Sequence, residues 1–253
     1  MSDTVTREAT FQQHLETEHR QSPFANYFKE VIYGGIDGII TTFAVVAGFS
    51  GAAFSNETTT QLSFLVVLLF GLANLFADGV SMGLGNFLSV KSEQDLYREA
   101  RKKESHEVVA NTHMEFQETI TILMQKGYSQ EDAQAMAELY RKNKTYWVDF
   151  MMNHELEMPD PRGDNPFFTG LATFASFLTF GAIPLLPFML QVSADSRTVF
   201  YYSVLGTFVA LVILGTLKWK VVGSHLYKAL AEVVLIGSVA ACVAFIVGSM
   251  FTL

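Results

Sequence analysis

Five long apolar stretches dominate this sequence and constrain its fold more than any other feature. Crossing the hydrocarbon core of a bilayer takes about 20 mostly apolar residues, so each stretch is long enough to form one transmembrane helix. The sequence therefore predicts an all-α integral membrane protein with five transmembrane helices. The expected spans lie near residues 31–54, 61–90, 166–190, 198–217 and 229–252.

A charged stretch at about 91–164 separates the second span from the third. It carries fifteen acidic and ten basic residues, and its apolar residues recur at helical rather than alternating spacing. These features predict a small helical insert outside the membrane. The second apolar stretch is longer than a span needs, so its helix is expected to continue into the charged run KSEQDLYREARKKESHE.

Local signals divide the insert into helices. Lys126-Gly127 predicts the end of one helix, and Ser129 with Asp132 three residues later predicts the N-cap of the next. A last helix is expected over about 145–158, before a run of proline and glycine. The predicted organisation is an N-terminal amphipathic segment, two spans, the insert and three further spans, at residues 1–29, 30–90, 91–164 and 165–253.

The positions of lysine and arginine predict the orientation, because positively charged loops are retained on the cytoplasmic side. Basic residues precede the first span, fill the insert and lie between the fourth and fifth spans, and only Arg197 falls on the other side. We therefore expect a cytoplasmic N-terminus, a cytoplasmic insert and an external C-terminus. The first apolar run is too long for a signal peptide. Short tails without sorting motifs favour a prokaryotic plasma membrane.

Cysteine content and net charge exclude several classes of protein. The single cysteine, Cys242, cannot form an intramolecular disulfide, and it rules out a site built from several cysteines. The formal charge of −8 argues against nucleic acid as a partner.

Asp37 is the candidate functional residue of the first expected span, where it stands in the segment YGGIDGIITTF. It lies about six residues, or roughly 9 Å at 1.5 Å per residue, inside the membrane. A carboxylate at that depth is costly unless it has a partner or a role. Asp37 is therefore a candidate for ion passage, with helix packing or capping as the alternative.

Four side chains of the second expected span share one helix face, because they follow one another at i, i+4 spacing. They are Asn74, Asp78, Met82 and Asn86. The expected depth of Met82 matches that of Asp37, so the two side chains can meet across a helix pair; ordinary packing is the alternative for Met82. Glycines in both segments would permit close helix approach.

The insert carries two pairs of glutamates with a spacing of three residues. They are Glu104 with Glu107 and Glu115 with Glu118. Each pair shares a helix face and can offer two carboxylates to one cation. The alternative is a solvated helix face, since basic residues stand next to the first pair.

A third cluster in the insert combines Met151, Met152 and Glu155. Carboxylates alone suit Mg²⁺, Ca²⁺ or Mn²⁺, whereas a thioether biases a site toward softer transition metals. Ferrous iron fits this mixture of ligands. Three histidines near these clusters are left outside the site, because such histidines are commonly exposed; they are His106, His113 and His154.

Several motifs resemble one known family. The first span contains DGIITTFAVVAGFSGA and the second ends in SMGLGNFLSVKSE, and these are followed by WVDFMM in the insert and IPLLP in the third span. In these motifs the chain resembles the vacuolar iron transporters, which include plant, yeast and bacterial members. The resemblance runs from about Tyr33 to the fifth span, and we expect a bacterial member.

The resemblance implies roles for particular residues. The family's metal-collecting domain uses two E-x-x-E pairs, a Met-Met dipeptide and a later Glu, and its pathway uses the Asp of DG and the Met of SMGLG. A homodimer and the exchange of metal against protons are implied in the same way. The implied metal ligands are Glu104, Glu107, Glu115, Glu118, Met151, Met152 and Glu155, and the implied pathway residues are Asp37 and Met82.

One position departs from the family pattern. Plant members carry a Glu two turns before the pathway Met, where this chain has Asn74. Asp78, one turn closer to Met82, can supply the missing carboxylate; otherwise the pathway or its proton coupling differs from that of the plant proteins. The role of Glu232 in the fifth span is left open between packing and proton coupling.

The sequence thus predicts a proton-coupled transporter, not an enzyme, that exports Fe²⁺ from the cytosol, with Mn²⁺, Co²⁺ or Zn²⁺ as alternative substrates. One rival is a membrane-bound di-iron ferroxidase, which would need two E-x-x-H motifs on facing helices. The chain offers one such spacing, Glu16 and His19, outside the insert. The other rival, a metal sensor, leaves Asp37 and the polar face of the second span unexplained.

Overall fold

The computed structural model describes residues 27–53, 60–190, 196–223 and 225–250. Regular structure in these ranges is helical throughout, which confirms the all-α prediction. The chain divides into two compact units, the span unit (Met1–Asn86 with Phe167–Leu253) and the insert unit (Phe87–Pro166). Most of the predicted segment 1–29, including Glu16 and His19, lies outside the described residues.

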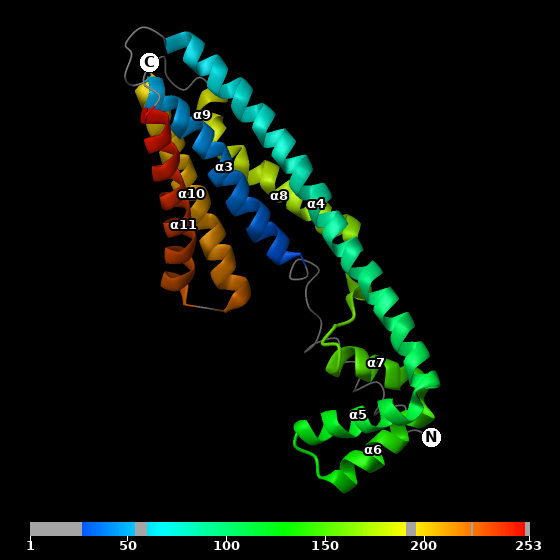
Figure 1. Cartoon of the computed structure of the whole chain (residues 1–253). Helices are drawn as coiled ribbons and strands as arrows, with labels where there is room; N and C mark the ends of the chain where they lie inside the picture. The colour runs from blue at the N-terminus through cyan, green and yellow to red at the C-terminus, as the bar shows by residue number, and fades with distance from the viewer. Residues whose placement is uncertain (1–26, 54–59, 191–195, 224, 251–253) are drawn as a thin grey trace, which may run out of the picture. The chain divides into compact units, whose positions relative to one another are not determined.

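Within the described ranges, five helical segments are long and apolar enough to cross a membrane, as predicted. Each apolar stretch forms a helix because a helix satisfies the backbone polar groups inside the segment, which lipid cannot do. The five segments are α3 (Phe28–Ala53), α4 (Thr60–Ala110), the broken segment Pro166–Met189, α10 (Ser196–Val222) and α11 (Leu226–Met250). Figure 1 shows α3, α4, α10 and α11 as long unbroken helices.

The α4 helix continues well beyond its apolar part. It has 51 residues, and at 1.5 Å per residue its length is about 75 Å, more than twice the roughly 30 Å hydrocarbon core. Its apolar part ends where the charged run begins at Lys91. The predicted extension of this helix beyond its apolar part is therefore confirmed.

The third span is broken, although the sequence predicted one continuous segment. α8 (Pro166–Gly181) is followed by the 3-10 turn η2 (Ile183–Leu185) and the short α9 (Leu186–Met189). Pro184 and Pro187 cause the break, because proline lacks the N–H that a regular helix requires. Ser203 of α10 donates a hydrogen bond to the Pro184 carbonyl at 2.7 Å, which satisfies one acceptor at the break.

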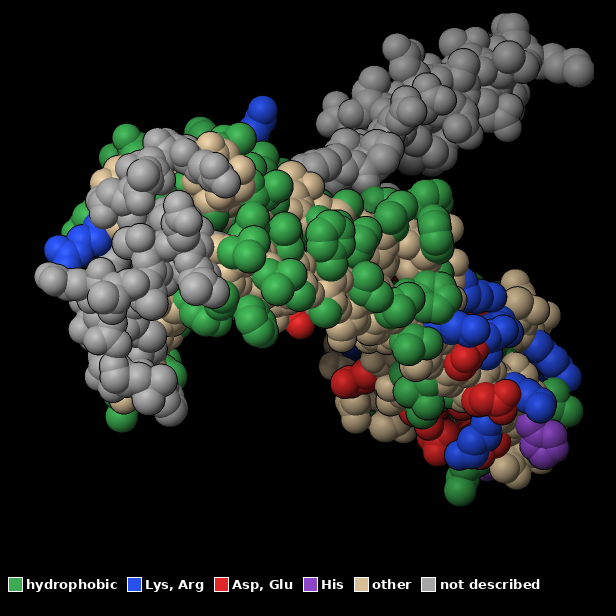
Figure 2. Space-filling model, turned by 90° about the horizontal axis from the view of Figure 1, so that it is seen from above, with side chains coloured by type: hydrophobic (Ala, Val, Ile, Leu, Met, Phe, Trp, Pro, Cys, Tyr) green, Lys and Arg blue, Asp and Glu red, His purple; other side chains and the backbone are tan. Residues whose placement is uncertain are grey.

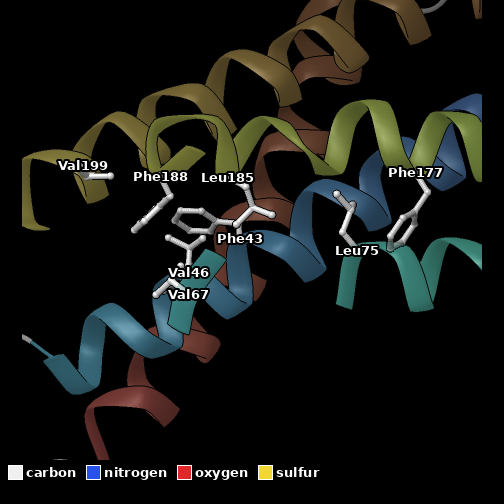
Figure 3. Close-up of a cluster of buried hydrophobic side chains, with 9 residues drawn as sticks. Phe43, Val46, Val67, Leu75, Phe177, Leu185, Phe188 and Val199 are labelled. Atoms are coloured by element: carbon white, nitrogen blue, oxygen red, sulfur yellow. The ribbon is translucent and has the colours of Figure 1, made fainter. Parts of the chain in front are cut away.

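The span unit is held together by apolar side chains from all of its helices. α3, α10 and α11 pack on one another and run side by side in Figure 1. In Figure 3, Phe43 of α3 points toward Leu185 and Phe188 of the broken third span. These side chains form one buried cluster with Val46, Val67, Leu75, Phe177 and Val199.

Close approach between helices occurs where glycines face α8. A Cβ atom on Gly38 of α3 would lie 2.4 Å from the Phe177 carbonyl oxygen, and one on Gly83 of α4 would lie 3.0 Å from the Gly170 carbonyl oxygen. The close approach expected from these glycines is therefore made by both helices to α8.

The insert unit contains the second half of α4 and three shorter helices. These are α5 (Thr112–Gln125), α6 (Gln130–Lys142) and α7 (Lys144–His154). Gly127 has a φ of +99° after the end of α5, and the Asp132 amide donates to the Ser129 hydroxyl at 3.1 Å. The predicted helix end and N-cap are both confirmed.

The last insert helix is shorter than predicted. α7 ends at His154 rather than at 158, and Glu157 has a φ of +51°. A positive φ cannot continue a right-handed helix. Glu155 therefore stands just after the helix end, but it keeps helical backbone angles and its amide donates to the Met151 carbonyl one turn before it.

The insert unit has its own apolar core around Trp147, which is fully buried. Arg101 of α4 ties α7 to this core, because its Nε and Nη2 both donate to Asp149 Oδ1, at 3.1 and 2.8 Å. Figure 2 shows many acidic and basic side chains on the visible surface of this unit. The other core residues include Tyr97, Val108, Leu123, Val148, Met151 and Met152.

Candidate metal-binding site

Three carboxylates converge within the insert unit. Glu104 comes from α4, Glu115 from the first turn of α5 and Glu155 from the residue after α7. One oxygen of each lies within 4.8 Å of the others. Oxygen ligands at such spacing can bind a single cation. The structure thus brings together three of the five predicted glutamates, from three different helical elements.

Two of these carboxylates are buried and incompletely satisfied. Glu104 is 2% exposed and Glu115 is 5% exposed. Glu104 Oε1 and Glu115 Oε2 have no hydrogen-bond partner among the described residues. Because a buried charge is costly unless it is paired or coordinates a metal, these oxygens fit a cation bound between them.

The surroundings of the two carboxyl groups favour their protonated forms when no cation is bound. Burial raises the pKa of Glu104 to about 8, and the charges of Glu115 and Glu155 add to the effect. Burial and the Glu118 charge raise the pKa of Glu115 to about 7, while a hydrogen bond from Glu104 opposes this rise. A metal ion would therefore displace protons from this pair when it binds.

Glu107 and Glu118 are half-buried and stand at the edge of this cluster. Both contribute negative charge that acts on Glu115. Lys103 Nζ lies 3.7 Å from Glu107 Oε1, so a lysine balances part of this charge. Such a lysine partner is what the alternative interpretation, a solvated helix face, predicts. Glu107 and Glu118 stay predicted ligands.

Met151 and Met152 are fully buried in the insert core. The Met151 sulfur lies 3.4 Å from the Thr119 hydroxyl, and Thr119 stands one turn after Glu115 on α5. The Glu155 amide donates to the Met151 carbonyl at 2.9 Å. Met151 thus contacts Thr119, one turn after Glu115, through its sulfur, and it contacts Glu155 through its backbone carbonyl.

The three histidines that the sequence left outside the site are exposed. The ring of His154 lies 4.7 Å from that of Phe150, measured between centroids. The group of converging carboxylates, as found among the described residues, includes none of these histidines.

In the span unit, Asp37 of α3 and Asp78 of α4 interact electrostatically. Both side chains are half-buried. The two carboxylates carry like charges, so this interaction is repulsive, and the pathway role of Asp37 and Asp78 stays a prediction. Met82 is also half-buried and packs against the core cluster that contains Phe43, so packing accounts for part of its environment.

The predicted polar face of α4 has a uniform environment. Its four members are all half-buried. The residues that directly follow the first three members, Leu75, Gly79 and Gly83, are buried against α8. Asn86 Nδ2 donates to Thr173 Oγ1 of α8 at 2.7 Å, which gives this end of the face a partner. The four members are Asn74, Asp78, Met82 and Asn86.

Glu232 has a partner that sequence reasoning did not identify. Lys218 of α10 donates to Glu232 of α11, so the acidic side chain forms an ion pair within the helical hairpin. The positions of the two residues could have predicted this pair. Lys218 lies near the end of α10 and Glu232 near the start of α11, and consecutive antiparallel helices bring such positions together.

Sequence reasoning also missed the polar side chains that support the insert site. Thr119 and Trp147 are buried and hydrogen-bonded to each other, and Arg101 pairs with Asp149. Thr119 had a signal in the sequence, since it stands four residues after Glu115 on the same helix face.

Comparisons with known proteins agree with one another. The VIT family profile matches residues 28–249. A vacuolar iron transporter from Toxoplasma gondii is 35% identical over 246 residues, which cover 93% of this chain and 78% of that protein. Vacuolar iron transporter 1 from Arabidopsis thaliana is 36% identical over 219 residues, covering 86% of this chain and 83% of that protein.

A third relative, the vacuolar iron transporter of Plasmodium falciparum, is 33% identical over 227 residues, with 87% of this chain and 80% of that protein covered. The family profile spans nearly the whole sequence, and the relatives exceed 30% identity over most of both chains. These matches confirm the resemblance seen in the motifs. This chain belongs to the VIT family.

Proposed function

We propose that this protein is a divalent metal transporter that exports Fe²⁺ from the cytosol in exchange for protons. The observation that carries the proposal is the convergence of Glu104, Glu115 and Glu155, with buried oxygens that lack partners. The family and the transporter names of its relatives point to a transporter rather than an enzyme.

The insert unit would capture the metal. Its carboxylates supply hard oxygen ligands, and the thioethers of Met151 and Met152 supply softer ones, a mixture that suits a transition metal. Glu107 and Glu118 add charge at the edge of the site. Fe²⁺ is the proposed substrate, because the relatives are named for iron; Mn²⁺, Co²⁺ and Zn²⁺ are proposed as further substrates on ligand chemistry alone.

Asp37 and Asp78 would pass the metal through the membrane, with Met82 as a soft ligand on the same face of α4. The electrostatic interaction between the two aspartates supports this role, because two carboxylates in a span favour a cation between them. The same groups can take up protons once the metal has left, which would couple the two fluxes.

The proposed orientation has the N-terminus and insert in the cytoplasm, because basic residues other than Arg197 lie on one side of the predicted spans. Export then means movement away from the cytosol. The prokaryotic plasma membrane stays a prediction, since the relatives compared above are eukaryotic proteins. We also propose the homodimer that the family resemblance implies, which mass measurement in detergent can test.

The test is Fe²⁺ uptake into inside-out vesicles under an imposed proton gradient. Wild-type protein should accumulate iron and lose this uptake when the gradient is dissipated. Asp37→Ala should abolish uptake, because it removes a pathway carboxylate. Asp95→Ala is the control, since Asp95 is an exposed aspartate that pairs with Arg98 on α4.

Two results would contradict the proposal at different points. Absence of uptake by folded wild-type protein, with every candidate metal tried, would exclude metal transport. Normal uptake by Asp37→Ala would leave transport standing but exclude the proposed route through the spans.

A further inference from the structure

A buried chain of three side chains runs through the core of the insert unit, one helical turn from Glu115 and Glu155. Trp147 Nε1 donates a hydrogen bond to Thr119 Oγ1 at 2.7 Å. Thr119 Oγ1 in turn lies 3.4 Å from the Met151 sulfur. All three residues have no exposed surface, so their contacts are made away from water.

Donor and acceptor counting shows what Thr119 does. A threonine hydroxyl has one proton to donate and two lone pairs. It accepts from Trp147 and has two possible acceptors, the Glu115 carbonyl at 2.7 Å and the Met151 sulfur. The carbonyl is the closer and stronger acceptor. The sulfur is a second and weaker acceptor of the same hydroxyl proton, so this hydrogen bond orients it while leaving its lone pairs largely free.

This contact restrains a side chain that is otherwise adaptable. Methionine has three rotatable bonds and fills irregular spaces in more than one conformation. Thr119 stands one turn after Glu115, and the Met151 carbonyl accepts from the Glu155 amide. A sulfur held at Thr119 thus stays near the turns that carry two of the three carboxylates.

We propose that Thr119, fixed by Trp147, is a positioning residue that directs the Met151 thioether toward the carboxylate cluster. In this way it sets the preference of the site for softer transition metals over harder cations, because sulfur is a softer ligand than oxygen. The inference rests on the metal site of the proposed function and adds to it a determinant of metal choice.

The experiment is a titration of the full-length protein in detergent with Co²⁺ and with Mn²⁺, followed by calorimetry. Thr119→Val keeps the shape of the side chain and removes the hydroxyl. The ratio of Co²⁺ to Mn²⁺ affinity should fall by about tenfold, as for loss of other groups that orient metal ligands. Thr119→Ser, which keeps the hydroxyl, should retain the ratio of the wild type.

Thr121→Val is the matched control. Thr121 lies on the same helix and makes the same backbone hydrogen bond, to the Gln117 carbonyl at 2.8 Å, but it is exposed. Its substitution should leave both affinities unchanged. Met151→Leu should lower the ratio as Thr119→Val does, and adding Thr119→Val to Met151→Leu should lower it no further, because the thioether is then already absent.

An equal loss of both affinities in Thr119→Val would overturn the inference, since a merely structural role lowers both alike. An unchanged ratio would overturn it as well. If Thr119→Val does not fold, Trp147→Phe, which removes the N–H that fixes Thr119, must lower the ratio or the inference is wrong. Wild-type protein that binds neither metal would instead contradict the proposed function.

Discussion

Glu104 and Glu115 are carboxylates that the fold withdraws from water without giving every oxygen a partner. Their raised pKa values mean that the folded insert binds protons more tightly than the unfolded chain does. Linkage then makes the folding free energy depend on pH. The burial that suits the site to a cation therefore makes the metal-free insert sensitive to pH.

The metal-free insert should lose stability as the pH rises. The stabilisation from protonated Glu104 and Glu115 is fully present below the pKa of an unfolded glutamate, about 4.5, and is lost as the pH rises through about 7 and 8. Thermal unfolding in chelator, followed by Trp147 fluorescence in a Trp219→Phe background, should give a lower midpoint at pH 8 than at pH 5.

Glu104→Gln should flatten this dependence, because a neutral amide of similar shape replaces the carboxyl group. Glu99→Gln, an exposed change on the same helix, should leave it as in the wild type. A midpoint that rises between pH 5 and pH 8 would show that the carboxyl groups are not protonated as we infer.

At the scale of the helices, α8 is the element against which α3 and α4 both pack through glycine. The position that Gly38 occupies has no room for a side chain, because a Cβ there would lie 2.4 Å from the Phe177 carbonyl oxygen. Gly85 of α4 differs, since a Cβ there would meet no atom of the described chain within 4 Å.

Gly38→Ala should destabilise the protein in detergent by about 1 to 3 kcal/mol, the usual cost of overpacking, and lower the thermal midpoint. Gly85→Ala should have no such cost, because alanine is favoured over glycine inside a helix by about 1 kcal/mol. Scanning fluorimetry on both variants provides the comparison. Equal midpoints for the two would mean that α3 and α8 are not in close contact.

An ion pair between Lys218 and Glu232 joins α10 to α11. Glu232→Leu should lower the thermal midpoint slightly, because it removes the partner of Lys218 in a partly exposed ion pair, and such pairs contribute about 0 to 1 kcal/mol. Lys218→Leu combined with Glu232→Leu should recover much of the loss, since no unpaired charge remains.

Lys220→Leu serves as the control for this pair, because Lys220 is an exposed lysine on the same helix. A double variant whose loss equals the sum of the two single losses would show that the two side chains do not interact energetically.

For the whole molecule, the two units divide capture from passage in the proposed mechanism. Glu104→Gln with Glu115→Gln should raise the Fe²⁺ concentration needed for half-maximal transport and change the maximal rate little, because capture adds binding before the translocation step. Asp37→Asn should lower the maximal rate even at saturating iron. Concentration-dependent uptake in vesicles separates the two effects.

Glu131→Gln with Glu138→Gln is the matched control for the insert, since both are exposed glutamates on α6. If the Glu104 and Glu115 double change lowers the maximal rate and leaves half-saturation unchanged, the insert takes part in passage and the division between units is wrong.

The amino-acid sequence by itself determined the helical class, the five spans and the extension of α4. These features depend on the length of each apolar stretch and on helical spacing, which are local properties of the chain. The N-cap at Ser129 and the helix end at Gly127 were predictable for the same reason. The same-face spacing of Asn74, Asp78, Met82 and Asn86 was also a local property.

The tertiary structure decided which carboxylates meet most closely within the ligand set that the family resemblance implied. Spacing paired Glu104 with Glu107 and Glu115 with Glu118, whereas the fold joins Glu104, Glu115 and Glu155. This convergence depends on how α4, α5 and α7 pack around Trp147. Such packing is set by contacts between residues far apart in the chain, and no local pattern of the sequence records it.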